Sequence, residues 1–312
     1  MTRFAAVDCG TNAIRLLVAD VVGGRLTEVT RRMLTVRLGE GIDATGEFAP
    51  AALERTFAAV DEYASDIARF DVREVRMVAT SASRDARNAQ VFVDGVRERL
   101  GVEPEVIAGT QEAELSFIGA IRGLSPSLLE SPVLISDIGG GSTEFVLGDA
   151  VTASITAACS VDVGCVRMTE RHLHDDPPTR EQIEAATTTI DANLDEAFAQ
   201  VPIHDVQTFV GLAGSVTTVA ALARRLPAYD SDAIHGSVVS LADVEKVTDH
   251  LLGMTRAERA AEPVMHPGRV DVIAGGALVL RQIMRRLPIG FVLASETDLL
   301  DGIVYRLSEK VG

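Results

Sequence analysis

The run of residues best suited to chemistry is Asp137-Ile138-Gly139-Gly140-Gly141-Ser142-Thr143-Glu144, which lies between two apolar stretches. Three consecutive glycines allow the backbone to take positive φ and to approach a ligand closely. Successive amide groups in such a turn form an anion-binding nest, and Ser142 adds a hydroxyl donor. Asp137, at the expected end of a strand, can hold Mg²⁺ or its waters. The segment therefore predicts a phosphate site with a metal ligand beside it.

A second segment of the same kind, Asp8-Cys9-Gly10-Thr11-Asn12, stands near the start of the chain. Thr11 and Asn12 can donate hydrogen bonds to a phosphate, and Arg15 lies one strand period beyond them. By itself this segment is equally well interpreted as a structural turn. Its repetition at Asp137 favours a second phosphate loop.

A third glycine-containing segment, Gly211-Leu212-Ala213-Gly214-Ser215, is expected to join a buried strand to a helix. The amide groups of Gly214 and Ser215 would then lie near a helix N-terminus, where the helix dipole favours an anion. A tight strand–helix turn packed on the sheet is the structural alternative.

Two arginines in loops are further candidates for phosphate contact. Arg84 lies in the segment from Thr80 to Asn88, where it could clamp a phosphate together with the hydroxyl of Ser81. The alternative for this segment is a helix cap with solvated arginines. Arg269 follows the sequence His266-Pro267-Gly268 in the second half of the chain.

Glu112 stands in Gly109-Thr110-Gln111-Glu112-Ala113-Glu114, which is expected to open a helix after a short strand. A glutamate in the first turn of a helix usually complements the helix dipole. The same carboxylate could instead act as a general base that deprotonates an attacking water. The residues alone leave both interpretations open.

These segments are predicted to lie at the ends of strands in a unit that occurs twice. Each copy begins with an apolar strand ending in aspartate, followed by a turn and two further strands. The main expected strands are 4–7, 14–22, 26–38 and 75–79, then 133–136, 143–147, 151–158 and 206–210. The main expected helices are 50–70, 88–100, 111–121, 179–200 and 216–226. The repeat implies two similar α/β domains, with a seam at 123–132.

Composition narrows the class of protein further. The 312 residues suffice for two domains, and the formal net charge of −16 argues against a nucleic-acid binder. A polyanionic substrate is compatible with this net charge, because the local charge of a site and a bound metal ion determine whether the site attracts an anion. No apolar run reaches the roughly 18 residues of a membrane span, and no secretion signal is evident, so a cytoplasmic protein is expected. Three scattered cysteines make a disulfide framework or zinc site improbable.

Taken together, these motifs resemble those of the exopolyphosphatase / guanosine pentaphosphate phosphohydrolase (Ppx/GppA) family, in its short form. The family lies within the superfamily of sugar kinases, Hsp70 and actin. The matching pieces run in order along the whole chain: residues 8–15, 80–88, 109–113, 137–144, 211–215, 235–236 and Arg269. The segment 137–144 carries most of the specificity.

The resemblance implies a fold of two ribonuclease-H-like domains with an active site in the cleft between them. The expected domains are 1–122 with 298–312, and 123–297. It also implies hydrolysis of the terminal phosphate of inorganic polyphosphate, with Mg²⁺ or Mn²⁺ as cofactor. Homodimers occur among relatives and are expected here, whereas nucleic acid and membrane are not expected partners.

The resemblance also assigns roles to individual residues. Glu112 is implied as the base that activates water, and Glu144 as a catalytic residue linked with Asp137 to the metal and to water. Asp8 is a further expected metal ligand. The expected phosphate-binding residues are Gly10, Thr11, Asn12, Arg15, Ser81, Arg84, Gly139, Gly140, Gly141, Ser142, Gly214, Ser215 and Arg269.

Two departures from the family pattern bear on substrate choice. Ala13 stands where relatives usually have serine, so the first loop lacks one hydroxyl donor. The chain is also expected to be the short form, without the C-terminal helical domains of some relatives, which favours short polyphosphate chains. Guanosine pentaphosphate is the alternative substrate, although a chain with 4% aromatic residues and no tryptophan offers few stacking platforms. A kinase of the same superfamily and a non-catalytic phosphate sensor are weaker alternatives.

Overall fold

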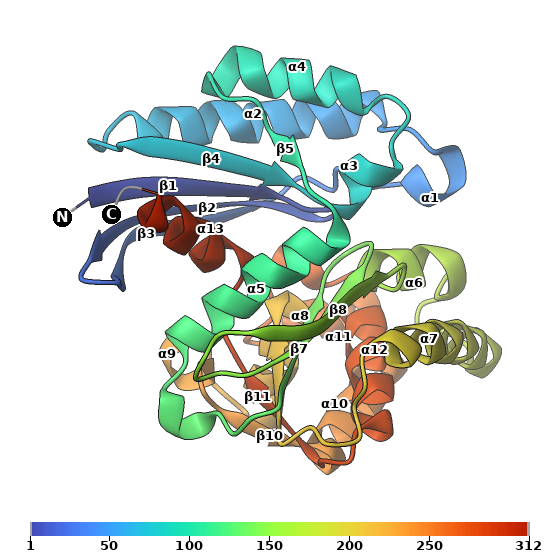
Figure 1. The fold of residues 1–312 in the computed structure, drawn as a ribbon. Helices are drawn as coiled ribbons and strands as arrows, with labels where there is room; N and C mark the ends of the chain where they lie inside the picture. The colour runs from blue at the N-terminus through green and yellow to red at the C-terminus, as the bar shows by residue number, and fades with distance from the viewer. Residues whose placement is uncertain (1, 311–312) are drawn as a thin grey trace. The chain divides into compact units, whose positions relative to one another are not determined.

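The computed structural model describes residues 2–310, which form two units (Figure 1). The first unit comprises the residues up to Gly119 and from Leu299 onward, and the second runs from Ala120 to Asp298. Each unit is built on one mixed β-sheet with helices against it, so the predicted α/β class is confirmed. No helix among residues 2–310 combines the length and apolarity needed to cross a lipid bilayer.

The sheet of the first unit has the strand order β3-β2-β1-β4-β5. Its strands are β1 Thr2–Cys9, β2 Ala13–Val22, β3 Arg25–Thr35, β4 Glu74–Ala79 and β5 Glu105–Val106. Its helices are α1 Ile42–Thr45, α2 Pro50–Ile67, α3 Ser81–Asp85, α4 Ala89–Leu100, the start of α5 Gly109–Gly123, and α13 Leu299–Glu309. The first three strands are antiparallel neighbours, whereas β1, β4 and β5 run parallel. Gly23 and Gly24, with φ of 57° and 78°, form the tight turn between β2 and β3.

Helices cover both faces of this first sheet (Figure 1). Successive residues of β1 point to opposite faces, so Ala5 and Val7 pack in one core with α2 and α4. Phe4 and Ala6 pack in a second core with α13. Asp8 follows the same alternation and lies on the side of Phe4 and Ala6, at the end of the strand.

The sheet of the second unit has the order β10-β11-β9-β6-β7-β8. Its strands are β6 Val133–Ile138, β7 Thr143–Gly148, β8 Ile155–Val161, β9 Thr208–Leu212, β10 Val238–Ser240 and β11 Phe291–Ala294. Its helices are α6 Cys165–His172, α7 Arg180–Gln200, α8 Ala213–Ala223, α9 Ser231–Ile234, α10 Leu241–Gly253, α11 Arg256–Ala261 and α12 Ile273–Arg286, with 3₁₀ turns Pro126–Leu128 and Pro267–Arg269. One large apolar core joins this sheet to α7, α8, α10 and α12.

The internal repeat is visible in the pairing of the strands. In each unit an antiparallel strand–turn–strand pair is followed by a third antiparallel strand and then by a parallel strand on the other side. Asp8 faces Arg15 across β1 and β2, and Asp137 faces Glu144 at the same place in β6 and β7. The predicted ribonuclease-H-like core is thus present in both units.

Several expected elements differ from the structure at an end: β3 stops at Thr35 rather than at residue 38, α2 stops at Ile67 rather than at 70, and β9 is Thr208–Leu212 rather than 206–210. Two further differences affect β8 and α8. A strand from residue 151 was expected, but β8 begins at Ile155 because Asp149 Oδ1 accepts hydrogen bonds from the amides of Val151 and Thr152. These bonds hold 149–152 as a turn and lower the pKa of Asp149. The helix expected from residue 216 begins instead at Ala213, directly after β9.

Candidate active-site residues in each unit

Three predicted site segments of the first unit meet at the carboxyl edge of its sheet. The ends of β1, β4 and β5 are in register, and the Thr80 amide donates to Cys9 O (3.2 Å) while the Ile107 amide donates to Ala79 O (3.1 Å). The segments that follow these strands are 10–12, 80–84 and 107–112. Ligands of open α/β sheets bind at this edge, so the topology brings the expected loop, Arg84 and Glu112 to one place.

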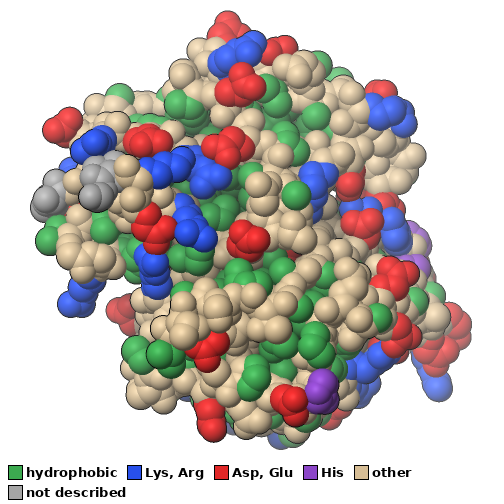
Figure 2. Space-filling model, viewed as in Figure 1, with side chains coloured by type: hydrophobic (Ala, Val, Ile, Leu, Met, Phe, Trp, Pro, Cys, Tyr) green, Lys and Arg blue, Asp and Glu red, His purple; other side chains and the backbone are tan. Residues whose placement is uncertain are grey.

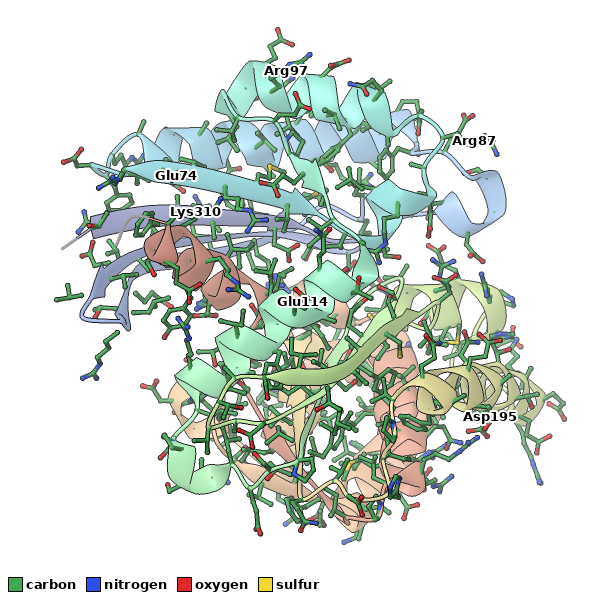
Figure 3. The ribbon with its side chains drawn as sticks, viewed as in Figure 1. Glu74, Arg87, Arg97, Glu114, Asp195 and Lys310 are labelled. Atoms are coloured by element: carbon green, nitrogen blue, oxygen red, sulfur yellow. The ribbon has the colours of Figure 1, made fainter. Side chains whose placement is uncertain are left out.

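Glu112 is 7% exposed and is held by Arg84. Arg84 Nη1 donates to Glu112 Oε2 (2.8 Å) and to the carbonyl of Ile107 (3.0 Å). The guanidinium therefore fixes the direction of the carboxylate. Glu114, on the same helix and labelled in Figure 3, is exposed. Of the two, only Glu112 is a shielded, oriented carboxylate of the kind that a general base requires.

The loop of residues 10–12 is fixed through its carbonyl groups. Asn12 O accepts the amides of Val36 (3.1 Å) and Arg37 (2.8 Å), and Thr11 O accepts that of Gly39 (2.9 Å). A Cβ on Gly39 would lie 2.3 Å from Thr11 Cγ2, so only glycine allows this close packing. The carbonyls of Thr11 and Asn12 are thus engaged by 36–39, and the amide of Gly10 donates to Ala13 O (3.0 Å), so hydrogen bonds within the first unit fix the backbone of this loop. Ser81, also expected there, is buried at the start of α3.

Asp8 and Arg15 bind each other. Arg15 Nη2 and Nε donate to Asp8 Oδ2 at 2.6 and 2.9 Å, and the Asp8 side chain is 5% exposed. The negative charge of Asp8, expected to bind a metal, is thus neutralised by the positive charge of Arg15, expected to bind a phosphate. The register of β1 and β2 makes the pair, because residues directly opposite on antiparallel strands lie on one face.

In the second unit the glycine loop 139–142 is bound to the N-terminus of α6. Gly139 O accepts the amide of Cys165 (3.0 Å), and Gly140 O accepts those of Val166 (2.9 Å) and Arg167 (3.1 Å). The loop carbonyls thereby satisfy amide groups that a helix start leaves open. The amides of Gly140 and Gly141 donate no hydrogen bond within residues 2–310, so they are available to donate to a bound anion.

Of the two reasons expected for the three glycines, positive φ is wrong, and close approach to a ligand stays a prediction. None of them has φ in the left-handed region; the glycines of residues 2–310 that do are 23, 24, 41, 46, 101 and 236. The glycine that the packing of this loop requires is Gly164, the residue before α6, because a Cβ there would lie 2.4 Å from Gly140 O. Arg167, which no local signal marked, further binds the loop by donating from Nε to Gly141 O (2.7 Å).

Asp137 and Glu144 face each other at the ends of β6 and β7, and both are buried. Glu144 Oε1 accepts the hydroxyls of Ser142 (2.7 Å) and Ser160 (2.8 Å). The expected phosphate donor Ser142 therefore orients a carboxylate instead, and Ser160 was not expected at all. Its place opposite Glu144 in the strand register is the signal that could have found it.

The donors at this place suit a magnesium ion. Within the described part of the chain, residues 2–310, no three His, Cys, Asp or Glu side chains gather at metal-binding distances. Mg²⁺ is usually bound by one or two carboxylates, with waters and substrate phosphates filling the remaining positions. Asp137 and Glu144 provide such a pair, beside amides suited to the phosphates.

The start of α8 is strained and is covered by an arginine. Ala213 has φ of 65°, a conformation that costs a non-glycine residue about 1–2 kcal/mol. A Cβ on Gly214 would lie 2.4 Å from Arg269 Cζ, so the guanidinium lies against the Gly214 backbone. Ser215 is buried against α12, where a Cβ on Gly276 would meet its Oγ at 2.1 Å. The two residues expected to bind phosphate, Gly214 and Arg269, are thus in contact.

Arg269 is oriented by residues that the sequence did not mark. Its Nη1 donates to Thr218 Oγ1 (2.9 Å), and its guanidinium lies 5.6 Å from the centre of the Tyr229 ring. Tyr229 Oη lies 2.7 Å from both Thr217 Oγ1 and Glu296 Oε1. Burial raises the pKa of Tyr229 to about 12, so the phenol keeps its proton at neutral pH.

Substitution of Gly214 by alanine is expected to raise KM about tenfold with little change in kcat, because the new methyl group displaces Arg269 from the α8 N-terminus. Steady-state phosphate release measures the effect. Gly290→Ala is the matched control, since no atom lies within 4 Å of its added Cβ. An unchanged KM in Gly214→Ala would show that the position of Arg269 does not matter for binding.

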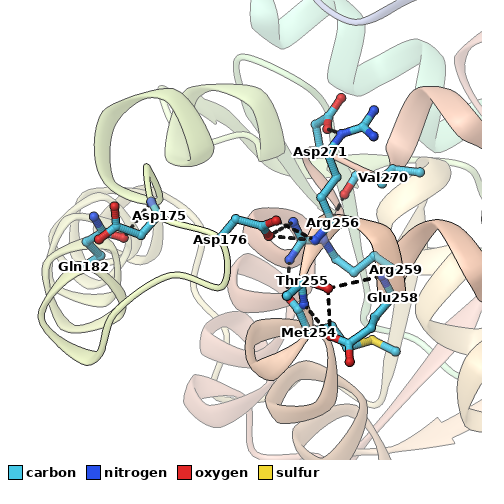
Figure 4. A network of polar contacts seen from close by, with 10 residues as sticks. All are labelled: Asp175, Asp176, Gln182, Met254, Thr255, Arg256, Glu258, Arg259, Val270 and Asp271. Carbon is cyan, nitrogen blue, oxygen red and sulfur yellow. Dashed lines mark hydrogen bonds and ion pairs between the residues drawn. The ribbon is translucent and has the colours of Figure 1, made fainter.

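The segment that carries Arg269 is fastened by the polar network of Figure 4. The buried Arg259 donates from Nε to Val270 O (3.0 Å), from Nη1 to Met254 O (2.7 Å) and from Nη2 to Asp176 Oδ1 (3.2 Å). Asp176 also accepts the Arg256 amide, so its loop is tied to the start of α11.

Arg259→Met is expected to lower the free energy of unfolding by about 2–4 kcal/mol, because two carbonyl groups lose their donor and Asp176 loses one of its two partners. Arg256→Met is the control: its side chain is 59% exposed and pairs only with Asp271 among the network residues. Its loss is expected to cost less than about 1 kcal/mol. Urea unfolding of both variants would contradict the assignment if the two midpoints fell equally.

The cysteines are free and buried. Burial raises the pKa of the Cys9 thiol and of the Cys165 thiol, although both stand beside candidate phosphate loops. Because a nucleophilic cysteine needs a lowered pKa, neither has the character of a catalytic thiolate.

Comparison with known proteins agrees with this arrangement. The model of the Ppx/GppA phosphatase family matches residues 17–311. Exopolyphosphatase 2 of Mycobacterium tuberculosis (strain ATCC 25618 / H37Rv) is 47% identical, over 99% of this chain and 99% of its own. The crystal structure of an exopolyphosphatase-like protein is 43% identical with a TM-score of 0.96, covering 99% of this chain and 98% of its own. A family member from Aquifex aeolicus is 29% identical with a TM-score of 0.83, covering 100% and 99%.

The chain therefore belongs to the Ppx/GppA phosphatase family. The family predicted from the motifs is confirmed, and the match extends over nearly the whole chain.

Proposed function

We propose that the chain is an exopolyphosphatase that hydrolyses the terminal phosphoanhydride bond of inorganic polyphosphate. The observation that carries the proposal is the buried Glu112 carboxylate, oriented by Arg84 at the carboxyl edge of the first sheet. The name of the mycobacterial relative, at 47% identity over nearly the full length, supports this choice of substrate.

Each of the two proposed domains supplies different groups for the reaction. Residues 1–122 with 298–312 supply Glu112 and Arg84, and residues 123–297 supply the loop 139–142, the N-terminus of α8 and Arg269. On the face drawn in Figure 2, arginine and lysine side chains lie among acidic ones rather than in a continuous basic surface. In a chain with net charge −16, binding a polyanion therefore rests on these local donors.

The reaction is an attack of water on the terminal phosphorus. Glu112 takes the proton of the water, a new P–O bond forms, and the bond to the bridging oxygen breaks. The shortened chain leaves with the electron pair of that bond. The amides of Gly140 and Gly141 and the guanidinium of Arg269 bind phosphate oxygens of the substrate.

Mg²⁺ or Mn²⁺ is the proposed cofactor, with Asp137 and Glu144 as its protein ligands. When bound, the ion supplies positive charge to the phosphate oxygens. Asp8, paired with Arg15, is proposed to keep the first loop in shape rather than to bind the metal. A preference for short chains, a cytoplasmic location and a homodimer complete the proposal.

The test is phosphate release, in parallel, from short polyphosphate, long polyphosphate, guanosine pentaphosphate and ATP with Mg²⁺ present. Release from polyphosphate that is lost in Glu112→Gln is expected. Release from guanosine pentaphosphate alone would assign the chain to the other substrate of its family. Absence of release from all four, with binding retained, would favour a sensor.

A further inference from the structure

A cavity lies in the second unit, at the C-terminal end of α8. Its volume is about 530 Å³, within the range of about 300–1,000 Å³ usual for small-molecule sites. Leu222, Val247 and Val264 form apolar walls, and Arg225 and Lys246 supply positive charge. None of these residues belongs to the proposed phosphate site.

Arg225 occupies a position where glycine would fit best. The amide of Arg225 donates to Leu222 O (2.9 Å) and that of Leu226 to Ala221 O (3.1 Å), which is the hydrogen-bond pattern of a Schellman motif. The residue at this position adopts the left-handed conformation, and Arg225 has φ of 54°. A side chain kept in such a strained conformation points to a function for that side chain.

The charges of the cavity favour an anion. The Arg225 guanidinium makes no side-chain hydrogen bond or ion pair within residues 2–310. Asp243 is a carboxylate near both cations: its Oδ1 lies 3.4 Å from Lys246 Nζ, and the charge of Arg225 helps to lower its pKa. The acidic residue of the lining, Glu262, is bonded to His250 Nε2 at 3.1 Å. Two exposed cations therefore stand over apolar walls.

We propose that this cavity binds a small organic anion. Its apolar body packs against Leu222, Val247 and Val264, and its carboxylate or phosphate lies between Arg225 and Lys246. An apolar pocket with a few convergent polar groups is the general form of such a site.

The cavity is also connected to the proposed phosphate site within the same unit. The helix α8, about 16 Å long, has the cavity at one end and Ala213 and Gly214 at the other. Residues 262–264 line the cavity, and Arg269 follows Val264 by five positions in the sequence. Occupancy of the cavity therefore alters the KM for phosphate substrates, a part of the inference that rests on the proposed function.

The binding is tested by isothermal titration calorimetry with 2-naphthoate and with its uncharged analogue 2-naphthalenemethanol. The wild type is expected to bind the anion and not the alcohol. Arg225→Gly is expected to weaken binding about tenfold while its Tm stays equal or rises, because glycine suits the left-handed conformation. Lys246→Gln is expected to weaken binding as well. Equal affinity for the alcohol, or unchanged affinity in Arg225→Gly, would overturn the proposal.

Two further measurements locate and extend the result. Affinity for 2-naphthoate is expected to be unchanged in Arg269→Gln. A loss of affinity there would place the anion in the proposed phosphate site and refute binding in the cavity at the end of α8. Saturating 2-naphthoate is expected to change the KM for polyphosphate in the wild type but not in Arg225→Gly. If KM does not move, the connection through α8 is wrong. The calorimetric measurement of binding does not depend on phosphatase activity, so it tests the cavity even if the proposed function is wrong.

Discussion

Glu112→Gln is expected to lower kcat for polyphosphate hydrolysis by about 10²–10⁴-fold, the range typical for loss of a general base. Glutamine keeps an oxygen that can accept the hydrogen bond of Arg84, so the site stays assembled and KM changes little. The amide does not take a proton from water at neutral pH. Steady-state phosphate release with short polyphosphate measures the loss.

Glu114→Gln is the matched control, because it makes the same substitution two residues along the same helix at an exposed side chain. Its kcat and Tm are expected to equal those of the wild type. Equal activities of Glu112→Gln and wild type would remove Glu112 from the mechanism and leave its carboxylate with a structural role beside Arg84.

Gly164→Ala is expected to cost about 3 kcal/mol of unfolding free energy and more than tenfold in kcat/KM. The added Cβ would lie 2.4 Å from Gly140 O, 2.5 Å from Gly140 C and 2.7 Å from Gly141 N. All three atoms belong to the backbone, so no side-chain rotation relieves the contact. The loop 139–142 must move away from α6 and lose the bonds that hold its carbonyls.

Gly253→Ala provides the comparison in the same unit, since nothing lies within 4 Å of its added Cβ. It is expected to be neutral or slightly stabilising. Urea unfolding and kcat/KM are measured for both variants. A Gly164→Ala protein with the wild-type midpoint and activity would show that the loop tolerates a different position, against the close packing described here.

Much of the fold could be predicted because apolar runs in this chain end at glycine turns. The segment 133–136 was recognised as a strand on this basis, and β6 extends to Ile138 through its pairing with Thr143. The same reasoning wrongly predicted a strand at 151–154, because the Asp149 side chain accepts hydrogen bonds from the amides of Val151 and Thr152 and holds a turn there. The start of α8 was missed because alanine rarely adopts the positive φ of Ala213.

The members of the candidate site were predictable by residue type, but most of their bonds were not. Expected phosphate donors proved to bind protein groups: Arg15 binds Asp8, and Ser142 binds Glu144. The first of these pairs follows from strand register, which a hairpin reading of 8–15 could have supplied. Arg167 and Tyr229 act through contacts distant in sequence, which periodicity does not encode. The catalytic roles themselves stay predictions.

The two strand–turn–strand copies differ at one pair of facing residues, and this difference has a consequence for redesign. A formally neutral pair, Asp8 and Arg15, stands in one copy, whereas Asp137 and Glu144 carry two like charges in the other. The first copy thus holds an ion pair, whereas the second places two carboxylates face to face, an arrangement that favours a cation. Arg15→Glu would give the first copy two facing carboxylates, and Glu144→Arg would give the second copy an ion pair. Either substitution makes the two copies alike, so the two positions could be used to change which half binds a cation.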